Sequence, residues 1–122
     1  TGARRISILC GNGGQFLTEE LARGADGAMT GFSYPEMMAD VVAAHEQGDT
    51  ARARDLFDAY LPFVRYEAQP GIGLAIRKHV LAARGAIAHP TLRRPGPALS
   101  PETVAEVETL LERQARRLAE LG

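Results

Sequence analysis

The chain has 122 residues, which is enough for one domain with a hydrophobic core. Its 45% hydrophobic and 24% charged residues are typical of a soluble globular protein, and a net charge of −1 provides no field that would attract nucleic acid. A single cysteine, Cys10, excludes an intrachain disulfide and a multi-cysteine zinc site. No apolar run approaches the ~20 residues of a membrane span. We therefore expect a cytoplasmic protein with no nucleic-acid or membrane partner.

Two strand–helix units are predicted in the first 47 residues. The apolar run 6–10, ended by Gly-Asn-Gly-Gly, is typical of a buried parallel strand, and residues 15–23 have helical spacing. A second strand is predicted over 27–31, and a second helix over 35–47 with Pro35 in its first turn. This order requires parallel strands joined by a right-handed crossover. Two strands cannot form a stable sheet alone, so other strands must complete them.

Three further helices are predicted after Gly48. The first is capped by Asp49 or Thr50, and Pro62 should kink or end it. The second covers 72–84, stops at Gly85 and is followed by a proline-rich loop over 86–99. The third begins at the N-cap Ser100. Its apolar face carries Val104, Val107, Leu111, Leu118 and Leu121.

The chain enters a core-like strand within a few residues of Thr1. This abrupt start leads us to expect a segment cut or processed from a longer protein.

Three stretches in this order resemble one enzyme family. They are ISILCGNGG, GADGAMTGFSYPEMM and GDTARARDLFDAYLPF. They are similar to strand seven, to strand eight with its helix, and to the first helix of the C-terminal extension in the dihydrodipicolinate synthase/N-acetylneuraminate lyase family of class I aldolases. The resemblance implies an α/β fold, the C-terminal portion of a (β/α)8 TIM barrel. Residues 1–47 would be its last two βα units, and 48–122 a three-helix extension.

The resemblance also implies the chemistry. Members bind pyruvate or another 2-oxo acid as an imine on a lysine, and this Schiff base allows carbon–carbon or carbon–oxygen bonds to break or form. The lysine and a proton-relaying tyrosine would lie upstream of this chain, so no catalytic residue is expected here. The chain alone should be inactive, and no cofactor or metal is implied. The expected partners are a 2-oxo acid substrate, the upstream half of the same barrel and the other subunits of a homotetramer.

Six residues are predicted to contact substrate, all at the carboxyl ends of the two strands, where barrel active sites lie. Gly11 would lie beside the substrate carboxylate, with Asn12 next to it, and Met29 would present its backbone carbonyl to the oxo acid. Thr30, Gly31 and Phe32 would line the mouth. Gly-Asn-Gly replaces the Gly-Asp-Asp of the synthases, and Thr30 to Tyr34 replace their Ser-Val-x-Ala-Asn run. Because of these departures, the substrate could also be a sugar acid or an aromatic aldol, and the sequence does not choose between them.

Other reactive side chains have plainer interpretations. Lys78, the only lysine, is expected to be an ion-paired helix residue remote from the barrel mouth. His45, His79 and His89 are too dispersed for a metal site. Cys10 is expected to be a small buried hydrophobe, and the GNGG sequence a tight turn.

Two alternatives remain open at this point. One is a non-enzymatic helical interaction or regulatory module, which would not need the strand–helix–strand–helix opening. The other is a half-barrel that folds only as an oligomer or with a complementary fragment.

Overall fold

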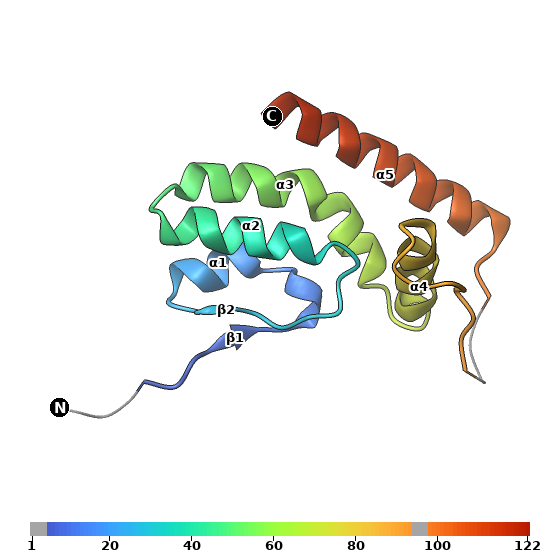
Figure 1. The fold of residues 1–122 in the computed structure, drawn as a ribbon, viewed down its shortest axis with the longest axis horizontal. Helices are drawn as coiled ribbons and strands as arrows, with labels where there is room; N and C mark the ends of the chain where they lie inside the picture. Colours follow the sequence, from blue (N-terminus) through green and yellow to red (C-terminus); the bar gives the residue numbers. More distant parts are fainter. Residues whose placement is uncertain (1–4, 94–97) are drawn as a thin grey trace.

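The computed structural model describes residues 5–93 and 98–122 (Figure 1). Residues 1–4 of the predicted first unit and 94–97 of the predicted loop lie outside this description. The elements, in order, are β1 (Leu9–Cys10), the 3-10 turn η1 (Asn12–Gly14), α1 (Leu17–Ala22), β2 (Gly27–Ala28), α2 (Pro35–Glu46), α3 (Thr50–Glu67), α4 (Gly73–Ala83) and α5 (Pro101–Leu121). The predicted order of two strand–helix units followed by three helices is confirmed.

The two strands pair in parallel, as predicted, with Leu9 opposite Gly27 and Cys10 opposite Ala28. Both are shorter than the predicted ranges 6–10 and 27–31. The Asp26 carboxylate accepts from Ile8 N at 2.7 Å, so a side chain takes the place of the next backbone partner. Residues before Leu9 have no second strand beside them among the described residues, and their predicted strand conformation is absent.

Local sequence determines where the first two helices and α3 begin. The 3-10 turn occupies Asn12–Gly14, so α1 starts at Leu17 rather than at the predicted residue 15. Pro35 is in the first turn of α2, as predicted. Asp49, rather than Thr50, caps α3, because its carboxylate accepts from Arg52 N at 3.0 Å.

Of the two outcomes predicted at Pro62, a kink or an end of the helix, the end does not occur, because α3 continues to Glu67. Proline removes one helical hydrogen bond, but Phe57, Phe63 and Val64 anchor the helix on both sides of it in the core. The last turns of α3 bend toward α4 (Figure 1).

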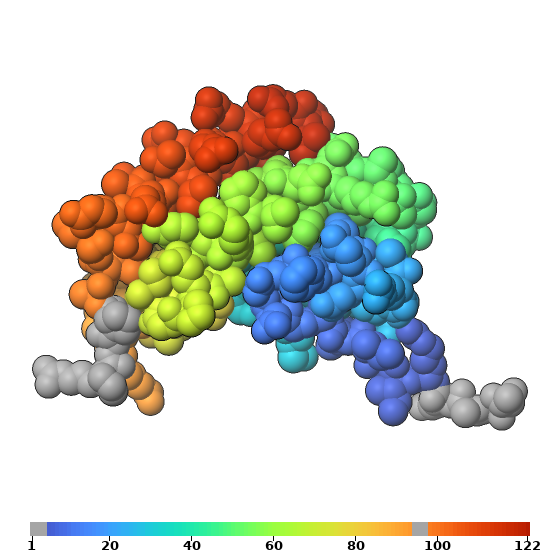
Figure 2. All heavy atoms as spheres, turned by 180° about the vertical axis from the view of Figure 1, so that it is seen from behind, coloured from blue at the N-terminus to red at the C-terminus, as the bar shows by residue number. Residues whose placement is uncertain are grey.

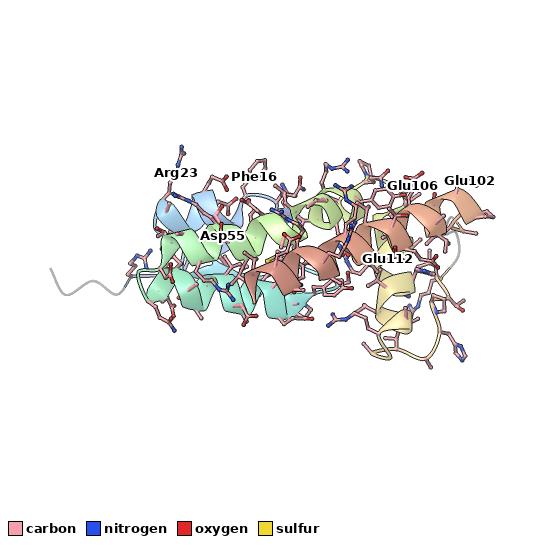
Figure 3. All side chains as sticks on the ribbon, turned by 90° about the horizontal axis from the view of Figure 1, so that it is seen from above. Phe16, Arg23, Asp55, Glu102, Glu106 and Glu112 are labelled. Atoms are coloured by element: carbon pink, nitrogen blue, oxygen red, sulfur yellow. The ribbon has the colours of Figure 1, made fainter. Side chains whose placement is uncertain are left out.

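The core lies on both sides of α3, which packs against α2, α1, α4 and α5. Figure 2 shows α5 along the outer side of α3 and the N-terminal elements on its other side. Met37 and Val41 of α2 are fully buried, and Met38 is buried beside them. Phe16 and Arg23, which flank the two ends of α1, project outward (Figure 3).

The last helix starts as predicted, since Ser100 Oγ accepts from Thr103 N at 3.1 Å and Pro101 is its first residue. It packs on α3, but its buried positions are Val107, Leu110 and Gln114. The predicted Leu111 and Leu118 are only partly buried. The centre of the predicted face was misplaced because the prediction omitted two buried residues, the apolar Leu110 and the polar Gln114. Within the described ranges, no helix combines the length and the apolar character needed to cross a membrane.

Candidate functional site

The parallel pairing brings the two predicted site segments to one edge of the sheet. Gly11 and Asn12 follow β1, and Met29 follows β2. The backbone N–H of Met29 donates to the Cys10 carbonyl at 2.9 Å, directly before Gly11. Parallel strands place their carboxyl ends side by side, as the barrel resemblance requires.

The GNGG segment is a tight turn, as predicted. Gly14 N donates to the Gly11 carbonyl at 3.0 Å. Asn12 and Gly13 have φ of 55° and 69°, the left-handed region that asparagine and glycine tolerate best. A β-carbon added at Gly11 would meet no atom within 4 Å. The described chain therefore leaves the space beside Gly11 open to a ligand.

The residues after β2 divide into an exposed part and a buried part. The Met29 side chain is 74% exposed, and Gly31 is also exposed. The Thr30 hydroxyl faces Met38 Sδ at 3.2 Å and accepts from Phe32 N at 3.3 Å, so both partners of this hydroxyl belong to the same chain. Phe32 is buried and lies in an aromatic cluster, with its ring centroid 6.0 Å from that of Phe63. Substrate contact by these residues stays a prediction, and the structure places the Phe32 ring in the core rather than at the mouth.

A buried carboxylate holds the segment that follows Phe32. Glu67, at the end of α3, accepts from Ser33 N at 3.2 Å and from the Ser33 hydroxyl. It also accepts from Arg77 Nε at 2.9 Å, which links α3 to α4. Both Ser33 and Glu67 are buried, so these bonds replace the water that the charged and polar groups lose.

A second arginine of α4 completes the anchoring of Ser33. Arg84 Nη1 donates to the Ser33 carbonyl at 2.6 Å, and the same guanidinium pairs with Glu36. It also lies over the Tyr34 ring, with Cζ 4.1 Å from the ring centroid. The helices of the predicted extension thus hold all three polar groups of Ser33.

Sequence reasoning missed this network, although one signal pointed to it. Glu67 lies four residues after Phe63 and three after Val64, which places an acid on the apolar face of its helix. Its partners Ser33 and Arg77 come from other elements, and no local pattern in the sequence pairs them.

The plainer interpretations of Lys78 and Cys10 are supported with one change. Lys78 Nζ donates to the Thr91 carbonyl at 3.2 Å, and the predicted ion pair of Lys78 is not found among the described residues. Most of its helix α4 lies apart from β1 and β2 (Figure 1), and only the first turns of α4 border the turn after β1. Cys10 is buried, as predicted, and this burial together with the negative charge of the Glu20 carboxylate raises the pKa of its thiol to about 11. Such a thiol is a poor nucleophile near neutral pH.

No set of three or more metal-ligating side chains gathers within residues 5–93 and 98–122. At the carboxyl ends of β1 and β2, the groups available to a ligand are backbone groups, the Asn12 side chain and the Arg77 guanidinium.

Comparisons with known proteins agree with the resemblance in the motifs. No family model matches the chain. Over 99 residues, 80% of the chain, it is 34% identical to L-2-keto-3-deoxyarabonate dehydratase of Azospirillum brasilense and covers 31% of that protein.

Two solved structures superpose on nearly the whole chain. The dihydrodipicolinate synthase from Rhodopseudomonas palustris matches 90% of it with 51% sequence identity and a TM-score of 0.88, over 36% of its own length. The 4-hydroxy-tetrahydrodipicolinate synthase of Methylacidiphilum fumariolicum SolV matches 94% with 25% identity and a TM-score of 0.81, over 38% of its length. The chain thus spans about a third of the length of each relative that it matches. It is related to one part of the proteins of the dihydrodipicolinate synthase/N-acetylneuraminate lyase family, as its motifs predicted.

Proposed function

We propose that the chain is the C-terminal part of a Schiff-base-forming lyase that acts on a 2-oxo acid. It supplies wall and rim of the pocket, and the imine-forming lysine and the relaying tyrosine come from another segment of the complete barrel. The observation that carries this proposal is the superposition on 36% of a dihydrodipicolinate synthase at 51% identity.

The exposed apolar residues around the strands support a larger sheet. Ile6 is 82% exposed, and Ile8 and Leu9 are also largely exposed in the described chain. Side chains of this kind are usually buried. Beside β2, a groove of about 520 Å³ is lined mainly by apolar residues, among them Ala28, Met38 and Val42. Further barrel strands and helices would cover both surfaces.

Within such a barrel the residues of this chain have restricted roles. Gly11 leaves room for the substrate carboxylate, and the Met29 carbonyl faces the oxo acid. The imine formed on the lysine accepts the electrons released when a bond next to it breaks. This chemistry uses no metal and no organic cofactor.

A 3-deoxy-2-oxo sugar acid is the substrate class that we test first. The A. brasilense relative is a dehydratase named for such a compound. The Thr30 to Tyr34 segment also departs from the synthase run at the pocket rim. We further propose a cytoplasmic homotetramer, as the resemblance implies.

Borohydride trapping tests the reaction class. The complete protein and the isolated chain are each incubated with pyruvate and reduced, and the mass of the product is mapped to a residue. We expect a reduced adduct on a lysine outside residues 1–122 in the complete protein, and no adduct in the isolated chain. The Lys78→Arg variant of the complete protein should keep the adduct. An adduct on Lys78 would contradict the site assignment.

Gly11→Val tests the pocket wall in the complete protein. The open space around Gly11 predicts that valine leaves the fold intact, while its side chain occupies the place of the substrate carboxylate. Trapping should then fail although the melting temperature stays close to that of the unsubstituted protein. Unchanged affinity for pyruvate would show that Gly11 does not lie beside the substrate carboxylate.

The alternative of a non-enzymatic helical module is not favoured, since such a module has no use for the parallel pair β1–β2 or for similarity to these enzymes.

A further inference from the structure

A polar cavity of about 340 Å³ lies between the turn after β1 and the start of α4. Asn12 and Gln15 line it from the turn, and Gln69 and Arg77 line it from the helical part. Figure 2 shows the first residues of α4 beside the N-terminal elements. A residue of the extension therefore faces the same space as the predicted site residue Asn12.

Contacts on two sides fix the Arg77 side chain. Its Nε donates to the Glu67 carboxylate at 2.9 Å. On the other side it lies against Gly31, where an added β-carbon would be 2.8 Å from Nη1 and 3.0 Å from Cζ. Any side chain at position 31 would have to displace the guanidinium. Arg77 thus borders both predicted site segments. It lines the same cavity as Asn12, and its guanidinium lies against Gly31.

The ion pair is asymmetric in exposure, with 2% of the Glu67 side chain exposed and 30% of Arg77. The carboxylate is hidden and the cation reaches the surface. Nε is the nitrogen of Arg77 that has a protein acceptor in the described part of the chain, so the Nη groups keep donor capacity. A rigid guanidinium with its outer edge uncovered is suited to bind oxygen atoms of a ligand.

We propose that Arg77 is a specificity-determining residue that donates hydrogen bonds to the oxygen substituents of the substrate chain beyond its 2-oxo group. Glu67 is the positioning residue that orients it. This inference rests on the proposed function, and it separates long hydroxylated 2-oxo acids from pyruvate, which has no such oxygens.

The test measures half-saturating concentrations for borohydride trapping in the complete protein, with 2-keto-3-deoxy-L-arabonate and with pyruvate as probes. The variants are Arg77→Met, Arg77→Lys and the control Arg84→Met, which disturbs Ser33 but does not line the cavity. We expect Arg77→Met to raise the value for the sugar acid about tenfold or more, the usual effect of losing a hydrogen bond to a charged group, and to leave the value for pyruvate unchanged. Arg77→Lys keeps a charge for Glu67 but lacks the fork, and it should weaken the sugar acid selectively.

Arg84→Met should change both probes by the same factor. Equal losses for both probes in either Arg77 variant, or a wild-type protein without preference for the sugar acid, would overturn the role of Arg77. If the wild-type protein forms no adduct with either probe, the proposed function fails, and this inference fails with it.

Discussion

Replacing Glu67 by glutamine tests whether the buried carboxylate holds the segment between β2 and α2 against α3 and α4. Glutamine keeps the shape of the side chain but has one oxygen and one N–H₂ group. The amide oxygen can still accept from Ser33 N and Arg77 Nε, but the N–H₂ group then faces Ser33 Oγ, so the Ser33 hydroxyl hydrogen loses its acceptor and Arg77 loses its charged partner. Ser33 is fully buried, so water cannot replace its lost partner.

The cost follows from the exposure of each partner. A hydrogen bond to a charged group contributes about 1.5–3 kcal/mol, and an unsatisfied buried donor costs about 1–3 kcal/mol. Arg77 is 30% exposed, so water recovers part of the loss on that side. We expect Glu67→Gln to lower the free energy of unfolding by about 2–3 kcal/mol, a large part of a typical total of about 5–15 kcal/mol.

Glu120→Gln is the matched control. Glu120 pairs with Arg117 at 3.3 Å, but both side chains are about two-thirds exposed. This substitution should change stability by less than about 0.5 kcal/mol. Urea unfolding followed by circular dichroism measures both variants, with an unchanged m-value as the check on two-state behaviour. Equal effects of the two substitutions would refute the assignment of the Glu67 network as a stabilising contact.

Three further outcomes are expected. The pKa of about 11 for the buried Cys10 thiol predicts that thiol reagents near about pH 8 react with it only after unfolding; rapid labelling of the native protein would contradict its burial. Gly14→Ala should be less stable than Gly13→Ala in urea, since both positions have positive φ but only at Gly14 would the new carbon clash with the Met38 methyl; equal losses of stability would contradict this steric explanation. Burial raises the pKa of Tyr66, with a further contribution from its bond to Glu106. The folded state therefore binds this proton more tightly, and its stabilisation is complete below about pH 10 and lost as pH rises through the folded-state value. Tyr66→Phe should flatten the loss of unfolding free energy at alkaline pH, and an unchanged slope would contradict it.

Local sequence was sufficient for the features that depend on a few neighbouring residues. Ser100 and Pro101 define the start of α5 through one side-chain bond and one fixed backbone angle. Gly85, with φ of 79°, follows the end of α4, as expected for a residue without a β-carbon. The parallel arrangement followed from the order of elements, because a strand–helix–strand unit has few compact solutions.

Strand lengths and buried ion pairs depend on contacts that a local pattern does not contain. Strand residues need partners on both sides, and β1 and β2 have only each other in the described chain. The site was predicted where backbone segments follow strands, at Gly11 and Met29. The side chains that support it come from α3 and α4, and Glu67 lies 34 residues after Ser33.

The bond between Ser33 and Glu67 has a consequence for recombination between relatives. The turn at Gly48 looks like a natural crossover point, because it separates the barrel-like units from the helices. A crossover there would take Ser33 and Glu36 from one parent and Glu67, Arg77 and Arg84 from the other. Chimeric proteins joined at this turn should fold well only when both parents carry matching polar partners on the two sides.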